Sequence, residues 1–377
     1  MNLQLKEFQE YCLKQHVAFV SYSLPGTNMP ITFFSDVSKV REYNHMSDIE
    51  VKSGFILTPF QSEELPAIVI SDRNKNIGWK IDLDEFPKPG INGYNHKSSG
   101  FQCSSTFQQY SKQIEEIKKS IIAGEAKKVV LSRIKVLSDV NEMSLPDIFE
   151  ELVQLYTDAF VYLVFTPQSG IWLGATPESL LEIDSATFST MALASTKKFS
   201  GTVSDISWTE KELKEHSYVA DYVRKKLTVG NYSFHESERT TVRAGNVLHL
   251  RTIYNGTITN NEADWKKLVN LLYPTPAICG TENEATLQLI RKLEEHRREY
   301  YTGIIGPFNE KGKTNLFINL RCMKVEGDFA FLFAGGGILA ESTIKKEWDE
   351  TEMKFNTLIQ VIQKVKKRKK LPDDHVS

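Results

Sequence analysis

The chain has few cysteines, and their spacing is not that of a metal or disulfide scaffold. Its 377 residues contain four cysteines, at Cys12, Cys103, Cys279 and Cys322, and no two of them form a Cys-x-x-Cys pair. This spacing argues against a zinc ribbon and a disulfide framework, and it is typical of a protein from a reducing compartment. We therefore expect a cytoplasmic location.

The sequence also lacks long apolar runs and a marked excess of charge of one sign. No stretch approaches the roughly 18 uninterrupted apolar residues of a membrane span, and the first residues contain no apolar segment of a secretion signal. The formal net charge is −2, so no global field favours nucleic acid or an anionic membrane. The sequence therefore predicts no nucleic-acid partner and no membrane partner.

The composition itself is that of an ordinary globular protein. Hydrophobic residues make up 41% of the chain and charged residues 25%, and the length is ample for a large core. Residues 101–362 form one continuous pattern of strands and helices without a linker, and residues 1–100 contain shorter strand-like segments, which we expect to be a variable N-terminal part of the same fold. The basic run at 364–370 predicts a solvated helix end, and we expect residues 363–377 to be a frayed tail.

Hairpins interspersed with helices indicate the fold class. Tyr110, Ile114, Ile117 and Ile121 recur at helical spacing and predict an amphipathic helix. Strand pairs at 160–165 with 170–173 and at 180–183 with 187–193 favour an α+β fold on antiparallel sheet over a doubly wound parallel sheet. The remaining predicted elements are strands at 127–137, 302–305, 315–325 and 329–334, and helices at 208–227 and 285–293.

Residues 347–354 carry the most informative charge pattern. In a helix Glu347, Glu350 and Lys354 project from one side, since i, i+3 and i+7 superpose. The glycine-rich segment 334–338 just upstream is expected to be a flexible turn whose N–H groups can face an anion. Together these features point to a magnesium-assisted site for an acidic small molecule. The alternative is a solvated helix face after a loop.

A second pair of carboxylates lies on the predicted helix 208–227. Glu212 and Glu215 are spaced i, i+3 and could converge with Glu347 and Glu350 on one magnesium ion, which binds through a few carboxylates and keeps waters. The histidine and cysteine spacings of zinc sites are missing. An ordinary helix surface remains the alternative.

Lys128 and Glu178 are candidates for acid–base chemistry. Lys128 shares a strand face with Val130 and Ser132, so it either extends to the sheet edge or sits in a pocket, where burial would lower its pKa and make it a possible base. Glu178 follows Pro177 in a stiff turn beside apolar residues, where a raised pKa would suit a general acid. Glu178 could equally start a strand or helix.

Arg321 and His249 could contact a ligand. On the predicted strand 315–325, Asn319 and Arg321 point the same way, and that face is too polar for a core. It either lines a ligand cavity, where arginine grips a carboxylate, or is exposed. His249, between two leucines, is by itself more typical of a core histidine.

Together and in this order, these segments resemble the chorismate-utilising enzymes, most closely the isochorismate synthases. The resemblance covers residues 105–362 and leaves the first hundred unmatched. The stretches that carry it are Lys128-Val-Val-Leu-Ser-Arg133, Gly174-Ala-Thr-Pro-Glu178, Glu212-Leu-Lys-Glu215-His216, Leu248-His-Leu250, Pro274-Thr-Pro-Ala277 with Gly280, Asn319-Leu-Arg321-Cys322, Leu332-Phe-Ala-Gly335-Gly-Gly-Ile338 and Glu347-Trp-x-Glu350-Thr-x-x-Lys354.

The resemblance implies a fold and a set of roles. The fold is one large α+β domain, a two-layer antiparallel sheet sandwich flanked by helices, with the site in a deep cleft. Chorismate is the implied substrate, and Lys128 activates a water that attacks ring carbon 2 while Glu178 protonates the departing 4-hydroxyl. The implied Mg²⁺ ligands are Glu215, Glu350 and Glu347, and the implied substrate contacts are Ser195, Thr196, His249, Arg321, Gly335 and Lys354.

Fewer residues distinguish the subfamilies. Anthranilate synthases typically carry glutamine at the position of Lys128. One type of aminodeoxychorismate synthase has a nucleophilic lysine where this chain has Ala194. Water as nucleophile leaves isochorismate synthase, expected to serve menaquinone rather than siderophore synthesis, or salicylate synthase, which also eliminates pyruvate. We expect a monomer without a glutaminase subunit.

Two departures from the family pattern keep a third alternative open. Ser195 replaces a usual glycine, and Pro307 follows Gly306 where relatives often have an aromatic residue. A chorismate-binding homologue impaired at Ser195 would retain the fold without the activity. The charged residues of the implied site are all present, which argues against it.

Overall fold

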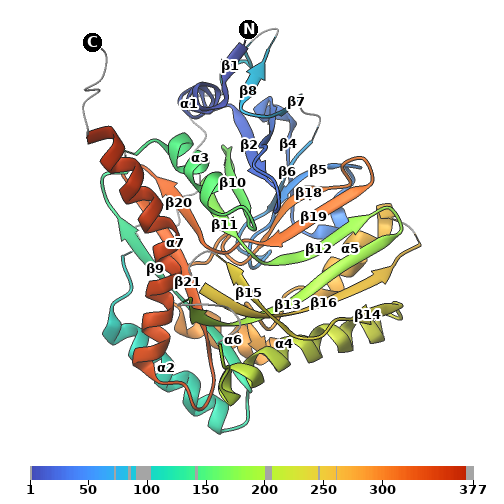
Figure 1. Cartoon of the computed structure of the whole chain (residues 1–377), viewed down its shortest axis with the longest axis vertical. Helices are drawn as coiled ribbons and strands as arrows, with labels where there is room; N and C mark the ends of the chain where they lie inside the picture. The colour runs from blue at the N-terminus through green and yellow to red at the C-terminus, as the bar shows by residue number, and fades with distance from the viewer. Residues whose placement is uncertain are drawn as a thin grey trace.

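Two large antiparallel sheets dominate the computed structural model, which describes residues 2–71, 74–83, 86–90, 103–140, 143–199, 206–244, 247–259 and 261–370 (Figure 1). The nine-stranded sheet has the order β17 (Gly280–Thr281), β9 (Lys128–Leu137), β21 (Phe329–Ile338), β20 (Cys322–Glu326), β11 (Gly170–Thr176), β10 (Phe160–Thr166), β2 (Ala18–Ser23), β3 (Ile31–Ser35) and β7 (Asn74–Ile77). A separate pair joins β1 (Asn2–Gln4) to β8 (Lys80–Asp82).

The second sheet has ten strands. Nine follow the order β14 (Phe234–Glu236), β16 (Val247–Thr257), β13 (Thr187–Lys198), β12 (Ser179–Asp184), β19 (Lys313–Ile318), β18 (Ile304–Phe308), β5 (Gly54–Leu57), β6 (Ala67–Ile70) and β4 (Val40–Tyr43). The tenth, β15 (Thr240–Ala244), also pairs with β16. Every pairing between neighbouring strands of this sheet is antiparallel.

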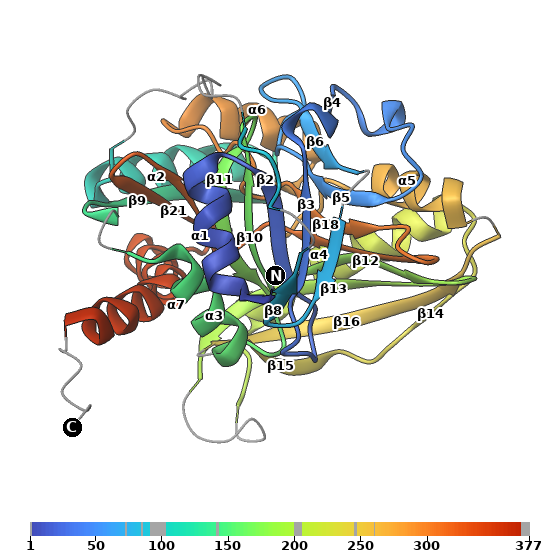
Figure 2. The same ribbon diagram turned by 90° about the horizontal axis from the view of Figure 1, so that it is seen from above.

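Seven α-helices of the described residues cover the outer faces of the sheets. They are α1 (Leu5–Gln15), α2 (Phe107–Ile122), α3 (Leu145–Leu155), α4 (Glu210–Val229), α5 (Asn261–Leu272), α6 (Asn283–Leu293) and α7 (Ile344–Lys370). Helix α4 lies along β13 and β16, and α7 runs along β21 (Figure 1). Helices α1 and α3 lie together beside the nine-stranded sheet (Figure 2). None of the described helices is both long and apolar enough to cross a membrane.

The main aromatic core lies between the two sheets. Tyr22 and Phe160 come from one sheet, Phe55 and Phe317 from the other, and all four are buried. The rings of Phe160 and Phe317 stack across the interface with their centroids 4.4 Å apart. The predicted α+β sandwich of antiparallel sheets is therefore confirmed.

Residues 1–100 contribute strands to both sheets. In the nine-stranded sheet β2 pairs with β10, and in the ten-stranded sheet β5 pairs with β18. The first hundred residues thus build part of the same sandwich as the motifs further along the chain. The predicted boundaries near residues 100 and 362 stay predictions.

The C-terminal basic run is helical. Helix α7 continues to Lys370, and Lys364 and Arg368 both pair with the buried Glu151 of α3. The basic run therefore belongs to the end of a helix, while the frayed tail stays a prediction. Residues 371–377 lie outside the described part of the chain.

The predicted strand 315–325 is wrong, because it is two strands in different sheets. Strand β19 ends at Ile318 in the ten-stranded sheet, and β20 starts at Cys322 in the nine-stranded sheet. Buried Asn319 fixes the crossing, since its amide donates to the Tyr300 carbonyl at 2.9 Å and its oxygen accepts from Tyr162 at 2.5 Å. The alternation of polar and apolar residues continues through this crossing, so periodicity could not reveal it.

Candidate active site

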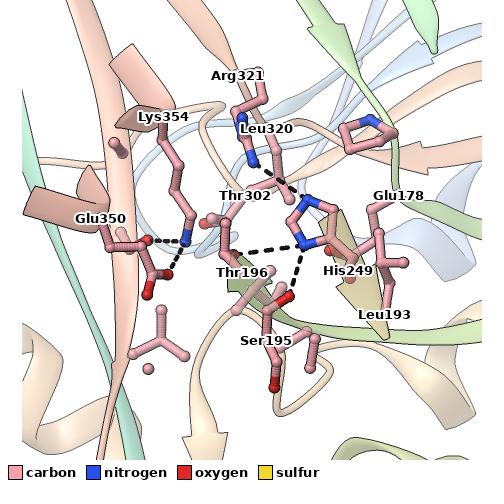
Figure 3. Close-up of a pocket in the computed structure, with 18 of the residues that line it drawn as sticks. Glu178, Leu193, Ser195, Thr196, His249, Thr302, Leu320, Arg321, Glu350 and Lys354 are labelled. Carbon is pink, nitrogen blue, oxygen red and sulfur yellow. Dashed lines mark hydrogen bonds and ion pairs between the residues drawn. The ribbon is translucent and has the colours of Figure 1, made fainter. Parts of the chain in front are cut away.

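One cavity gathers ten of the eleven predicted site residues. Figure 3 shows part of its lining, with Glu178, His249, Arg321 and Lys354 among the labelled side chains. Its volume is about 680 Å³ including the open mouth, and both sheets, α4 and α7 contribute to its wall. The predicted residues in that wall are Lys128, Glu178, Ser195, Thr196, Glu215, His249, Arg321, Gly335, Glu350 and Lys354. Glu347 lies outside the lining.

Lys128 occupies the pocket rather than the sheet edge. It is the first residue of β9, is 1% exposed, and its Nζ lies 3.2 Å from Oε1 of Glu215 on α4. The cavity exists here because β21 has glycine opposite. A Cβ on Gly337 would lie 2.3 Å from that Glu215 oxygen and 2.6 Å from Cε of Lys128.

The glycine-rich segment 334–338 is therefore not the predicted flexible turn. It lies inside β21 and pairs in register with β9, with Gly335 opposite Ser132 and Gly337 opposite Val130. The glycines allow other side chains to approach the β21 backbone closely and do not make it flexible. At Gly337 the missing side chain leaves room for Lys128 and Glu215.

Glu178 sits in an apolar setting that favours its protonated form. It precedes β12 and is 6% exposed. Burial raises the pKa of Glu178 to about 7, although the charges of Lys128, Lys354 and Arg321 pull it down. The carboxyl can therefore keep a proton near neutral pH and deliver it into the cavity.

A chain of hydrogen bonds orients Arg321 and His249 (Figure 3). Nδ1 of His249 donates to the Ser195 carbonyl at 2.8 Å, so Nε2 is free of a proton and accepts from Arg321 at 3.4 Å. Burial lowers the pKa of His249 to about 3, which keeps the ring neutral. Arg321 is held on its other side by Thr357 of α7 at 3.1 Å. Arg321 is only 8% exposed, which excludes the exposed sheet face.

Helix α7 places Glu350 and Lys354 on the cavity as predicted from their spacing. The Lys354 ammonium donates to Glu350 at 2.7 Å and to the Gly335 carbonyl at 2.6 Å. Burial pushes the pKa of Glu350 upward, but the charge and hydrogen bond of Lys354, together with the charges of Lys211 and Arg321, hold that pKa below its usual range. These side chains therefore do not form a solvated helix face.

Glu347 lies one turn before Glu350 and is 1% exposed. Its Oε1 accepts a hydrogen bond of 2.6 Å from the ammonium of Lys211 on α4. Burial and the charge of Glu350 raise the pKa of Glu347, while Lys211 opposes that rise. Sequence reasoning missed Lys211, although its position four residues before Glu215 puts both on one face of a helix.

The donor set suits an oxygen-preferring cation such as Mg²⁺. In the described ranges no three His, Cys, Asp or Glu side chains are gathered as a metal-binding group. Glu215, Glu347 and Glu350 each face a lysine instead. A further oxygen is available nearby. The buried hydroxyl of Tyr110 has no partner among the described residues, and a Cβ on Gly336 would lie 3.6 Å from it and 3.4 Å from Glu347. The three carboxylates therefore fit a Mg²⁺ ion if their contacts with the lysines are broken.

Glu212 is used in a different way from the other carboxylates. It accepts from the backbone N–H of Thr209 at 2.7 Å and so closes the capping box at the start of α4. Lys197 also pairs with it at 3.1 Å. Glu212 therefore fixes the end of the helix rather than joining a cation site.

Arg133 attaches α7 to β9 behind the cavity. Its guanidinium is 3.6 Å from the ring centroid of Trp348 and 4.7 Å from that of Phe355. It also donates to Thr351 at 2.7 Å and pairs with Glu352 at 2.5 Å. The helix that carries Glu350 and Lys354 is thereby held against the strand that carries Lys128.

Uncharged side chains form the rest of the cavity wall. Tyr301 and Thr302 precede β18, while Leu193, Ile278 and Phe333 supply apolar surface. Nothing in the sequence marks these residues as site residues, because they look like core positions. They form a wall suited to a small ring.

Comparison with known proteins agrees with this geometry. The family model described as "Chorismate binding enzyme" matches residues 88–363, more than half of the chain. Isochorismate synthase EntC of Escherichia coli K12 is 31% identical over 242 residues, 62% of this chain and 62% of that protein. The vibriobactin-specific isochorismate synthase of Vibrio cholerae is 26% identical over 264 residues, 68% of this chain and 67% of that one.

Comparison with solved structures also finds an isochorismate synthase with a similar fold. The solved structure of MenF, the menaquinone-specific isochorismate synthase of Escherichia coli, superposes with a TM-score of 0.76 at 17% identity, covering 96% of this chain and 94% of that chain. The sandwich, the cavity and the family match agree. The chain belongs to the chorismate-binding enzymes.

Proposed function

We propose that the protein is an isochorismate synthase, an isomerase that moves the hydroxyl of chorismate from ring carbon 4 to ring carbon 2. The observation that carries this proposal is the pair of Lys128 and Glu178 on one cavity, with the pKa of Glu178 raised to about 7 by burial. A buried amine and a buried protonated carboxyl supply the base and the acid that such an exchange requires.

The proposed reaction uses each group once. Lys128 takes a proton from water, and the water oxygen bonds to ring carbon 2. The ring double bond shifts, the bond from carbon 4 to its oxygen breaks, and Glu178 gives a proton to the departing hydroxyl. The atoms balance, since one water enters and one leaves.

The remaining residues would hold a diacid. Arg321 and Lys354 place two cations on the cavity, and the neutral His249 keeps Arg321 aimed without adding charge. Glu215, Glu350 and Glu347 would hold Mg²⁺, which supplies positive charge for the ring carboxylate. The apolar wall of the cavity would keep bulk water away from the ring of the substrate.

The choice within the family rests on Lys128 and Ala194. Both line the cavity, so the first is placed to activate water and the second offers no nucleophile. We therefore propose that the chain needs neither ammonia nor a glutaminase partner. We propose a menaquinone pathway for the product, to be tested by whether the gene rescues a strain that lacks isochorismate synthase for menaquinone or for a siderophore.

The test is to incubate the protein with chorismate and Mg²⁺ and to separate the products. Isochorismate alone supports the proposal. Salicylate with pyruvate indicates salicylate synthase, anthranilate in the presence of ammonium contradicts the proposal, and no product indicates an impaired homologue. Full turnover in excess chelator would refute the metal assignment.

Two variants test the acid–base pair directly. Lys128→Ala and Glu178→Gln should each lower kcat by roughly 10²–10⁴-fold while chorismate still binds. Lys127→Ala is the matched control, because Lys127 is exposed and pairs with Glu282 at the surface. Near-normal kcat in Lys128→Ala would mean that another group is the base.

A further inference from the structure

Lys211 places an ammonium among the carboxylates of the candidate cation site. Its Nζ lies 2.6 Å from Oε1 of Glu347, whose side chain is 2% exposed, while the Lys211 side chain is 29% exposed. Its charge also interacts with those of Glu215 and Glu350. One positive charge thus faces all three acidic side chains from α4 and α7.

The contact gives Glu347, the most buried of the three acids, a countercharge within the protein. Glu347 has no other ion-pair partner among the described residues, whereas Glu215 faces Lys128 and Glu350 faces Lys354. An unpaired buried carboxylate is costly, so Lys211 stabilises the metal-free site. A divalent ion would satisfy the same oxygen.

Lys211 and the cation therefore compete. We propose that Lys211 is a built-in counterion that occupies the cation's position at Glu347 and is displaced toward solvent when a divalent cation binds. This inference rests on the metal-dependent site of the proposed function. Its partly exposed stem gives the ammonium a route outward, which the fully buried Lys128 does not have.

The competition has a measurable consequence for affinity. The wild-type site must break the Lys211–Glu347 contact before it binds Mg²⁺, so removing the ammonium should tighten binding. A positioning role would have the opposite effect, because loss of Lys211 would then leave Glu347 misplaced and weaken binding.

Titration of the purified protein with MgCl₂ in a calorimeter tests the proposal. We expect Lys211→Met to lower the Kd for Mg²⁺ at least tenfold and to lower the metal-free Tm, with Mg²⁺ restoring the Tm. Lys214→Met is the matched control on the same helix, because Lys214 is 56% exposed and lies 3.9 Å from Glu341. Unchanged or weaker Mg²⁺ binding in Lys211→Met overturns the proposal.

A second measurement uses the unaltered chain and does not depend on how a variant folds. Acetylation of lysines, quantified by mass spectrometry, should increase at Lys211 when MgCl₂ is added and stay constant at Lys214. Equal labelling of Lys211 with and without Mg²⁺ overturns the displacement. If the metal results hold but the product is not isochorismate, the proposed function fails and the counterion stands.

Discussion

Three residues on the cavity, Ser195, Thr302 and Arg321, have left-handed backbone angles. Their φ values are +64°, +64° and +48°, a region that is strained for residues other than glycine. The angle at Ser195 gives a physical reason for the glycine that the family resemblance leads us to expect there. Its hydroxyl turns to α4, donating to the Glu212 carbonyl at 2.6 Å.

Replacing Ser195 with glycine should therefore preserve or improve chorismate binding. Glycine relieves the backbone strain, and the stronger of the two lost hydrogen bonds goes to the Glu212 carbonyl of α4, while the other, to Glu215, is long at 3.4 Å. Ser195→Ala is the control, since it removes the hydroxyl and keeps the strain. Fluorescence titration measures both Kd values, and a Kd at least tenfold weaker in Ser195→Gly, about 1.4 kcal/mol, would show that the hydroxyl is an adapted contact.

The raised pKa of Glu178 predicts how the stability of the protein depends on pH. Its carboxyl loses a proton near pH 4.5 when unfolded and near pH 7 when folded, because burial raises its pKa. Between these pH values the folded protein binds the extra proton, so its free energy of unfolding falls as pH rises. The side chain of Glu178→Gln cannot ionise, so its free energy of unfolding lacks this fall. Across this pH window the free energy of unfolding of the variant, measured by urea denaturation, should rise by about 3 kcal/mol relative to that of wild type.

The same group predicts the pH dependence of activity. As general acid Glu178 must be protonated, so kcat/KM should decline as pH rises through about 7. Stopped assays across the pH range measure this decline. A flat profile, or equal pH dependence of stability in wild type and Glu178→Gln, would contradict the buried protonated carboxyl.

At the scale of elements, the contact between α7 and β9 aligns the two halves of the site. Arg133 of β9 lies against Trp348 and Phe355 and pairs with Glu352, all on α7. Lys135 reaches the same Glu352 at 2.5 Å but is 28% exposed. The two basic residues therefore share a partner and differ in burial.

Arg133→Met should cost about 2 kcal/mol of stability and reduce kcat more than KM, because α7 carries Glu350 and Lys354. Lys135→Met should cost well below 1 kcal/mol, as is usual for a partly exposed pair. Thermal unfolding and steady-state kinetics provide the comparison. Equal effects of the two substitutions would show that the aromatic contacts of Arg133 do not position the helix.

The elements differ in how far the sequence could predict them. Helix spacing predicted one helix for Glu347, Glu350 and Lys354, and α7 carries all three, with Glu350 and Lys354 on the cavity, since 3.6 residues per turn depends only on local geometry. The glycines of β21 and the crossing at Asn319 were mispredicted, because both depend on strands distant in sequence. Lys211 was missed because its partner Glu347 lies on another helix.

At the scale of the molecule, the first hundred residues complete both sheets. Strand β2 covers the edge of β10, and β5 covers that of β18, so removing residues 1–103 would expose two strand edges and part of the aromatic core. We expect a chain of residues 104–370 to aggregate without a cooperative melt. Removing residues 371–377 alone should leave the Tm unchanged.

Circular dichroism and light scattering would compare both truncated chains with the full chain. A cooperative transition in the chain of residues 104–370 would mean that the later residues form a separate folding unit. The prediction follows from sheet pairing, which the sequence could not show, because no motif marks the first hundred residues.

The strand order of the nine-stranded sheet also has a consequence for folding during synthesis. Strand β9, which carries Lys128, has β17 and β21 as its only neighbours in the nine-stranded sheet, and both lie much later in the chain. Residues 138–328 are synthesised before β21 begins, which takes about 10–40 s at ribosomal rates. Until β17 is made β9 has two open edges, and the edge that β21 covers stays open for the whole interval, so β9 can pair with other nascent chains. Slower translation of this middle stretch should therefore lower the yield of folded protein without changing a single amino acid.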